Sequence, residues 1–89
     1  MTKAKHMILG IHITGRLQHA LPVQQVLTEF GRNIKTRLGL HEISGDKEAA
    51  NTGLMLIEFV GDESGFKEFQ QRLNAVEGVE AKALVFDHT

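Results

Sequence analysis

The chain contains no cysteine, no tryptophan, no tyrosine and only one proline. Without cysteine it can form no disulfide, no thiolate metal site and no cysteine nucleophile. Without tryptophan or tyrosine it shows no evident platform on which single-stranded nucleic acid would stack. A run of about 18 apolar residues and a signal-peptide pattern are also absent, so we expect a cytoplasmic protein that does not enter a membrane.

Charge of either sign is not in excess, because the formal net charge is −1. A nucleic-acid-binding domain usually carries a basic excess or a basic stripe, so we expect no direct nucleic-acid partner. The 89 residues predict a single domain, residues 1–89. So short a chain buries only about 60–65% of its unfolded surface, and oligomerisation would help to stabilise it.

Hydrophobic periodicity divides the chain into six elements. Residues 6–14 are apolar and β-branched and predict a strand that stops at Gly15. Pro22 suits the first turn of a helix from about Pro22 to Phe30, which one further turn before Pro22 could extend, and Gly31 suits its end. The apolar positions expected on one side of that helix are Leu21, Val26, Leu27 and Phe30. The remaining elements are a strand at 33–43, a polar loop at 44–51, a strand at 52–60, a helix within 61–78 and a strand at 79–87.

The second helix has signals at both ends and an apolar stripe between them. Asp62 or Ser64 can cap its start, and Gly78 can end it. The stripe consists of Phe66, Phe69, Leu73 and Val76. The resulting order β-α-β-β-α-β predicts an α+β, ferredoxin-like fold. Two right-handed crossovers then give a four-stranded antiparallel sheet of order 4-1-3-2 with both helices on one face.

Alternation along each strand predicts which side chains meet the helices and which lie on the open face of the sheet. The inward sets are Met7, Leu9, Ile11 and Ile13; Ile34, Leu38 and Leu40; and Met55, Ile57 and Phe59. The outward sets are Ile8, Gly10, His12 and Thr14; Lys35, Arg37, Gly39, His41 and Ile43; and Leu54, Leu56, Glu58 and Val60. In the last strand, Val79, Ala81, Ala83 and Val85 are more core-like than Glu80, Lys82, Leu84 and Phe86.

The open face should therefore carry apolar side chains that no helix covers. They are Ile8, Leu54, Leu56, Leu84 and Phe86. An exposed apolar patch of this kind usually marks a partner surface. We expect a homo-oligomer, a dimer or a tetramer, formed through this face or by edge-to-edge pairing of sheets.

Three polar residues on that face could form a cluster. Arg37 would lie opposite Glu58 if the hairpin loop is centred near residues 47–48. A parallel pairing of the first and third strands would bring His12 beside Glu58. Such a cluster is either a plain cross-strand ion pair with a neighbouring histidine or a ligand site. Gly39 would leave a notch beside it for a ligand or another backbone.

The sequence allows two further candidate binding sites. His12 and His41, with Glu58, would be acceptable zinc or nickel ligands, although no tight His-x-His spacing supports them. Gly15 can adopt positive φ and free backbone N–H groups at a helix start, where Arg16 could help to bind a small anion. The alternative for Gly15 is an ordinary βα turn. No nucleophile motif or fixed carboxylate pair is present, so we expect no enzyme, and the sequence does not identify a cofactor.

The first half of the chain resembles the ACT domains of small-molecule-sensing regulators. The resemblance lies in "ITGRLQHALPVQQVLTEFGRNI", a strand, a glycine turn, a helix ending in Phe-Gly and a second strand. The acidic-x-Pro-Gly turn of many ACT domains is missing. A closer resemblance, over nearly the whole chain, is to the small regulators of the iron-only ([FeFe]) hydrogenase system. It is carried by "VQQVLTEFGRNIKTRLGLHE", "GLMLIEFVGD" and "LNAVEGVEAKALVF".

This resemblance implies a stand-alone ACT-like domain with a regulatory role in [FeFe]-hydrogenase maturation or expression. It implies a non-enzymatic homo-oligomer without a DNA-binding domain of its own, binding a small-molecule effector or a partner protein. The fold is also similar to the C-terminal domain of the nickel-responsive repressor, but the cysteine and His-x-His ligands of that repressor are absent here. The alternative function is a metal-responsive sensor that uses the open-face histidines.

Overall fold

The structure, a computed structural model, describes residues 5–40 and 52–87. Its elements follow the expected order β-α-β-β-α-β. They are β1 (Lys5–Thr14), α1 (Arg16–Glu29), the 3₁₀ turn η1 (Gly31–Asn33), β2 (Ile34–Leu40), β3 (Thr52–Phe59), α3 (Glu63–Asn74) and β4 (Val79–Asp87). The part of the second strand expected beyond Leu40, with His41, and the loop at 44–51 lie outside the described residues.

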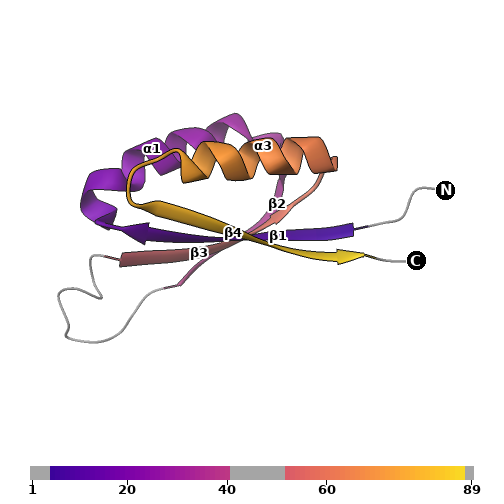
Figure 1. Ribbon diagram of the computed structural model, residues 1–89, viewed down its shortest axis with the longest axis horizontal. Helices are drawn as coiled ribbons and strands as arrows, with labels where there is room; N and C mark the ends of the chain where they lie inside the picture. Colours follow the sequence, from indigo (N-terminus) through magenta and orange to yellow (C-terminus); the bar gives the residue numbers. More distant parts are fainter. Residues whose placement is uncertain (1–4, 41–51, 88–89) are drawn as a thin grey trace.

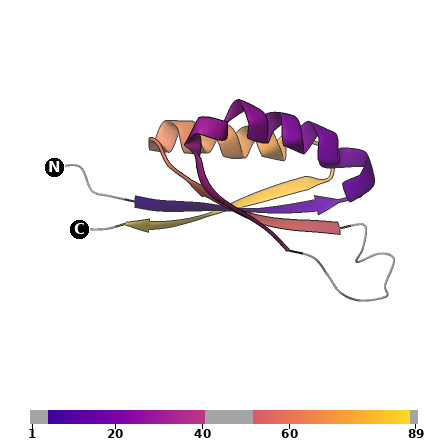
Figure 2. The same ribbon diagram turned by 180° about the vertical axis from the view of Figure 1, so that it is seen from behind.

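The four strands form one sheet of order β2-β3-β1-β4, in which every neighbouring pair is antiparallel. Both helices lie on the same face of this sheet, and the other face is uncovered by any described element (Figures 1 and 2). The predicted ferredoxin-like topology is confirmed, since 4-1-3-2 is the same order read from the other edge. The chain folds this way because each helix carries the chain across one face of the sheet, so that β3 returns between β1 and β2.

The core lies between the sheet and the two helices. The inward side chains of β1 and β3 are in it as predicted, and α3 contributes Phe66, Phe69 and Leu73. Phe69 packs between Phe30 and Phe59, with ring centroids at 4.9 and 5.5 Å. On β4 the more core-like set does face the helices, because Val79, Ala81, Ala83 and Val85 pair with the inward residues of β1.

Helix α1 begins six residues earlier than the sequence predicts. Pro22 lies inside the helix rather than in its first turn. Its apolar stripe is also different, since Val23 is buried and Leu21 is 68% exposed. Val23, Val26, Leu27 and Phe30 have the i, i+3, i+4, i+7 spacing of one helix face, which Leu21 does not share. Proline removes one backbone hydrogen bond from the helix, and packing of this stripe against the sheet offsets that loss.

Asp62 is the N-cap of α3. Its carboxylate accepts a hydrogen bond of 2.8 Å from the Gly65 backbone N–H and another of 3.1 Å from the Ser64 hydroxyl. The bond from Gly65, and to a smaller extent the bond from Ser64, lowers the pKa of the Asp62 carboxyl below its ordinary value. One of the two caps predicted for this helix is therefore confirmed, and Ser64 supports it.

Acid should therefore destabilise the protein partly through Asp62. A group whose pKa is lowered by folding stabilises the fold above its unfolded pKa, and this contribution disappears as the pH falls through the folded pKa, below about pH 4. Asp62→Asn keeps a capping oxygen but cannot be protonated in this way. We expect a smaller loss of melting temperature between pH 6 and pH 3 for Asp62→Asn than for the wild type. Equal acid sensitivity of the two proteins would contradict this assignment.

Candidate functional site

The open face of the sheet is the largest candidate site. The register places four outward residues side by side in a central row, Leu38, Leu56, Gly10 and Lys82. The rows on either side of it run through Thr36, Glu58, Ile8 and Leu84, and through Leu40, Leu54, His12 and Glu80. A further row pairs His6 with Phe86. The exposed apolar residues of the open face are Leu38, Leu54, Leu56, Leu84 and Phe86. We call these five side chains, with the half-buried Ile8, the open-face patch.

Strand β2 presents the opposite alternation from the one predicted. The register with β3 shifts between Ile34 and Thr36, as in a β-bulge. One additional residue in a strand reverses the face of every residue after it. Leu38 is therefore on the open face, opposite Leu56, while Arg37 and Gly39 pair with the inward residues of β3. The prediction that Arg37 and Gly39 face outward is wrong, and the patch gains Leu38.

The predicted cluster of His12, Glu58 and Arg37 does not form. β1 and β3 are antiparallel, because β3 returns between two strands that run in the same direction, so the parallel pairing was wrong. His12 lies between Leu54 and Glu80. Glu58 does lie on the open face, but its neighbours are Ile8 and Thr36 rather than His12 and Arg37. The Thr36 hydroxyl donates to the Glu58 carboxylate at 3.3 Å.

Gly10, rather than Gly39, lies at the centre of the open face. Its neighbours across the sheet are Leu56 and Lys82, and a methyl group added at Gly10 would be 3.8 Å from Leu56 Cδ2. Gly10 is therefore bordered by Leu56 and Ile8 of the patch on two sides and by Lys82 and His12 on the others. Sequence reasoning placed Gly10 on the outward set of β1 but did not connect it with a notch, because the register across strands cannot be read from a single strand.

The turn after β1 has the positive φ predicted for Gly15, with φ 66° and ψ 51°. Gly15 precedes α1, whose start receives no side-chain cap. The turn is closed by His19, whose Nδ1 donates to the Thr14 carbonyl at 2.7 Å, and by the Thr14 N–H, which donates to the Gly78 carbonyl at 2.7 Å. The Arg16 side chain lies outside the described part of the structure. Anion binding at Gly15 and Arg16 stays a prediction.

A metal site is not assembled in the part of the chain that the structure describes. Within residues 5–40 and 52–87, no group of three histidine, cysteine, aspartate or glutamate side chains is placed to hold an ion. His12 has Glu80 as its cross-strand neighbour, and His41 lies outside the described residues. Nor is any helix in those ranges long and apolar enough to cross a membrane.

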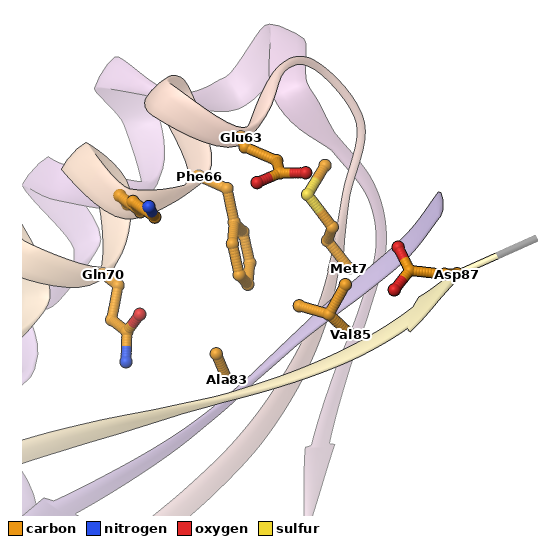
Figure 3. Close-up of a pocket in the computed structure, with 8 residues that line it drawn as sticks. Met7, Glu63, Phe66, Gln70, Ala83, Val85 and Asp87 are labelled. Carbon is orange, nitrogen blue, oxygen red and sulfur yellow. The ribbon is translucent and has the colours of Figure 1, made fainter. Parts of the chain in front are cut away.

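A second feature is a groove between α3 and β4, with a volume of about 280 Å³. Figure 3 shows Phe66 pointing from α3 toward Val85 and Ala83, with Glu63 and Asp87 at one end. Lys67 and Gln70 complete the helix wall, and Met7 contributes from β1. Sequence reasoning missed this groove, because it depends on how far α3 stands from the edge of the sheet.

No protein-family model matches the chain, and no curated protein matches it. Solved structures do. An uncharacterized protein from Thermotoga maritima is 20% identical with a TM-score of 0.78, over 93% of this chain and 99% of that one. The ACT domain of GTP pyrophosphokinase from Chlorobium tepidum is 19% identical with a TM-score of 0.67, over 93% of this chain and all of that domain.

A third similar structure is CPII from Thiomonas intermedia, which was solved with ADP, AMP and acetate. It is 12% identical with a TM-score of 0.54, over 100% of this chain and 93% of that one. At these identities the similarity establishes the fold. The protein therefore has an ACT-like, ferredoxin-like fold, which it shares with an isolated ACT domain and with CPII.

Proposed function

We propose that the chain is a regulatory, effector-binding domain that acts as a homo-oligomer through its open sheet face and catalyses no reaction itself. The observation that carries this proposal is the open-face patch, with Leu38 51%, Leu84 54% and Phe86 50% exposed. Apolar side chains from all four strands lie on this face, and exposed apolar patches of this kind usually mark a partner surface. A second copy that presents the same face would bury it in a symmetric contact.

The regulatory part of the proposal is supported by similarity. The fold is that of an ACT domain and of CPII, whose structure contains nucleotides and acetate. The sequence resembles the regulators of the iron-only hydrogenase system, so we propose that system as the setting in which the domain acts, in the cytoplasm. With a net charge of −1, any effect on transcription would require a DNA-binding partner.

Leu56→Glu should break the oligomer. Leu56 lies in the central row of the open face, so a carboxylate there would be buried against apolar side chains in the contact. We expect association at least about tenfold weaker by light scattering. Leu21→Glu is the matched control, since Leu21 is exposed on α1, which lies on the opposite side of the sheet. If both variants associate like the wild type, the open face is not the contact.

Effector binding should be visible as a rise in melting temperature. A ligand specific for the folded state stabilises it by mass action, by about 2.7 kcal/mol at 100 times its Kd. We would screen amino acids, nucleotides and divalent metals. An amino acid or nucleotide that raises the melting temperature supports the proposal. A rise confined to a metal and abolished by His12→Ala would favour the metal-responsive alternative instead, and no rise with any of them would contradict effector binding by these classes.

A further inference from the structure

Strand β4 is an edge of the described sheet. The outward backbone groups of one of its residues, Ala81, are already hydrogen-bonded to side chains of α3. The Ala81 N–H donates to Asn74 Oδ1 at 2.8 Å. The Ala81 carbonyl accepts from Asn74 Nδ2 at 3.1 Å and from Gln70 Nε2 at 3.0 Å. The amide of Asn74 thus takes the place of a neighbouring strand at Ala81. Because backbone groups alternate along a strand, the N–H and C=O groups of Ala83, Val85 and Asp87 also point away from β1.

From Ala83 to Phe86 the side chains at this edge are apolar on both faces of the sheet. On the helix side, Val85 is exposed at the rim of the groove that Phe66 lines (Figure 3). On the open face, Leu84 and Phe86 are half exposed. An edge strand with outward backbone groups and apolar flanks is a template for another strand, and proteins usually protect such an edge. Among the described residues, Asn74 and Gln70 give this protection at Ala81.

We propose that residues 83–87 of β4 pair with the same residues of a second copy, antiparallel about a two-fold axis through Val85. Only the odd-numbered residues present outward backbone groups, so hydrogen-bonded pairs must join odd to odd. The Asn74 amide already bonds the Ala81 backbone, so the pairing is limited to residues from 83 onward. A centre at Val85 uses all of them, with Val85 opposite Val85 and Ala83 opposite Asp87.

This register brings apolar side chains of the two copies together on both faces of the sheet. On the open face it places Leu84 of each copy opposite Phe86 of the other. On the helix side the two Val85 side chains meet between the two grooves. Asp87 of the second copy lies opposite Ala83, across the groove from Lys67 on α3. A second copy therefore fits this edge.

The edge contact rests on the backbone of β4 and shares only Leu84 and Phe86 with the open-face contact, and it extends the proposed function. Two different two-fold contacts on one chain generate a closed tetramer when their axes cross at right angles, whereas either contact alone generates a dimer. The two contacts can therefore fail independently. A protein that pairs only through β4 would lose no association with Leu56→Glu.

Cysteine trapping tests the register directly, because the chain has no cysteine of its own. In a hydrogen-bonded antiparallel pair the two Cα atoms are about 5.5 Å apart, which a disulfide can span. Val85→Cys should therefore form a covalent dimer under mild oxidation about tenfold faster than Leu21→Cys, whose cysteine meets another only by collision. Ala83→Cys and Asp87→Cys should each crosslink slowly alone and rapidly when the two proteins are mixed.

The result that would overturn the proposal is Val85→Cys crosslinking no faster than Leu21→Cys.

A second variant tests the backbone pairing. Val85→Pro removes an N–H that points away from β1, so the β1–β4 ladder is kept while addition of a strand is blocked. We expect a smaller assembly by light scattering with unchanged circular dichroism, and a folded Val85→Pro protein of wild-type mass would also refute the contact. Should this variant unfold, the cysteine experiment decides alone. Persistence of Val85→Cys crosslinking in a Leu56→Glu chain separates this contact from the open face.

Discussion

Replacing Phe69 by alanine should destabilise the protein by about 3–5 kcal/mol. Phe69 is fully buried, and its ring lies between Phe30 and Phe59 while the sheet closes the core below it. The substitution removes the ring from both contacts and leaves a cavity that the rigid sheet cannot close. A small domain is stabilised by only about 5–15 kcal/mol in total. The Phe69→Ala protein should therefore retain only a small free energy of unfolding.

The measurement for Phe69 is urea unfolding at a fixed protein concentration, followed by circular dichroism. Leu21→Ala is the control, because Leu21 is exposed on α1 and should change the free energy of unfolding by no more than about 0.5 kcal/mol. A loss below about 1 kcal/mol for Phe69→Ala would mean that the aromatic cluster does not form as described.

Gly78→Ala should destabilise the protein strongly, with a loss of about 2–5 kcal/mol in the free energy of unfolding. Gly78 has φ 78°, a left-handed conformation that other residues adopt only with strain. Its missing Cβ would lie 2.5 Å from His19 Nδ1 and 2.7 Å from the Thr14 carbonyl oxygen. The imidazole could move, but the carbonyl belongs to β1 and cannot move without disturbing the sheet.

Gly39→Ala is the matched control for this turn. No atom lies within 4 Å of the position of its Cβ, and its φ is not positive. We expect Gly39→Ala to be neutral or to stabilise by up to about 1 kcal/mol, since alanine reduces the freedom of the unfolded chain. Thermal unfolding of both variants tests the difference. If the melting temperatures of Gly78→Ala and Gly39→Ala are equal, the contact between β1, α1 and the start of β4 is not as tight as the structure has it.

The fold could be predicted because its signals are local. Alternating apolar residues in β1 and β3, and the Phe66–Phe69–Leu73 stripe of α3, each identify an element and its buried face. Those local patterns allow few topologies once crossovers must be right-handed. The start of α1 was predicted too late, because Pro22 favours a first turn, and only packing against the sheet carries the helix across it.

The site could be predicted only in part, because it depends on register. The apolar surplus of β3 and β4 was visible in sequence and does lie on the open face. The face of Leu38 depends on one irregularity at the start of β2, which no residue in that strand marks. The neighbours of His12 and Glu58 depend on how β1 and β3 are aligned, a long-range property. The Asn74 contact with Ala81 is likewise invisible until α3 and β4 are placed together.

The central claim is that the open-face patch is a contact between copies of this chain. Sedimentation equilibrium of the wild-type protein across a range of concentrations tests it most directly, because it gives mass without reference to shape. The chain has a mass of 9.9 kDa. We predict a species of at least twice that mass for the wild type and a smaller assembly for the Leu56→Glu variant. A wild-type protein that sediments as a single 9.9 kDa chain at every concentration would contradict the claim.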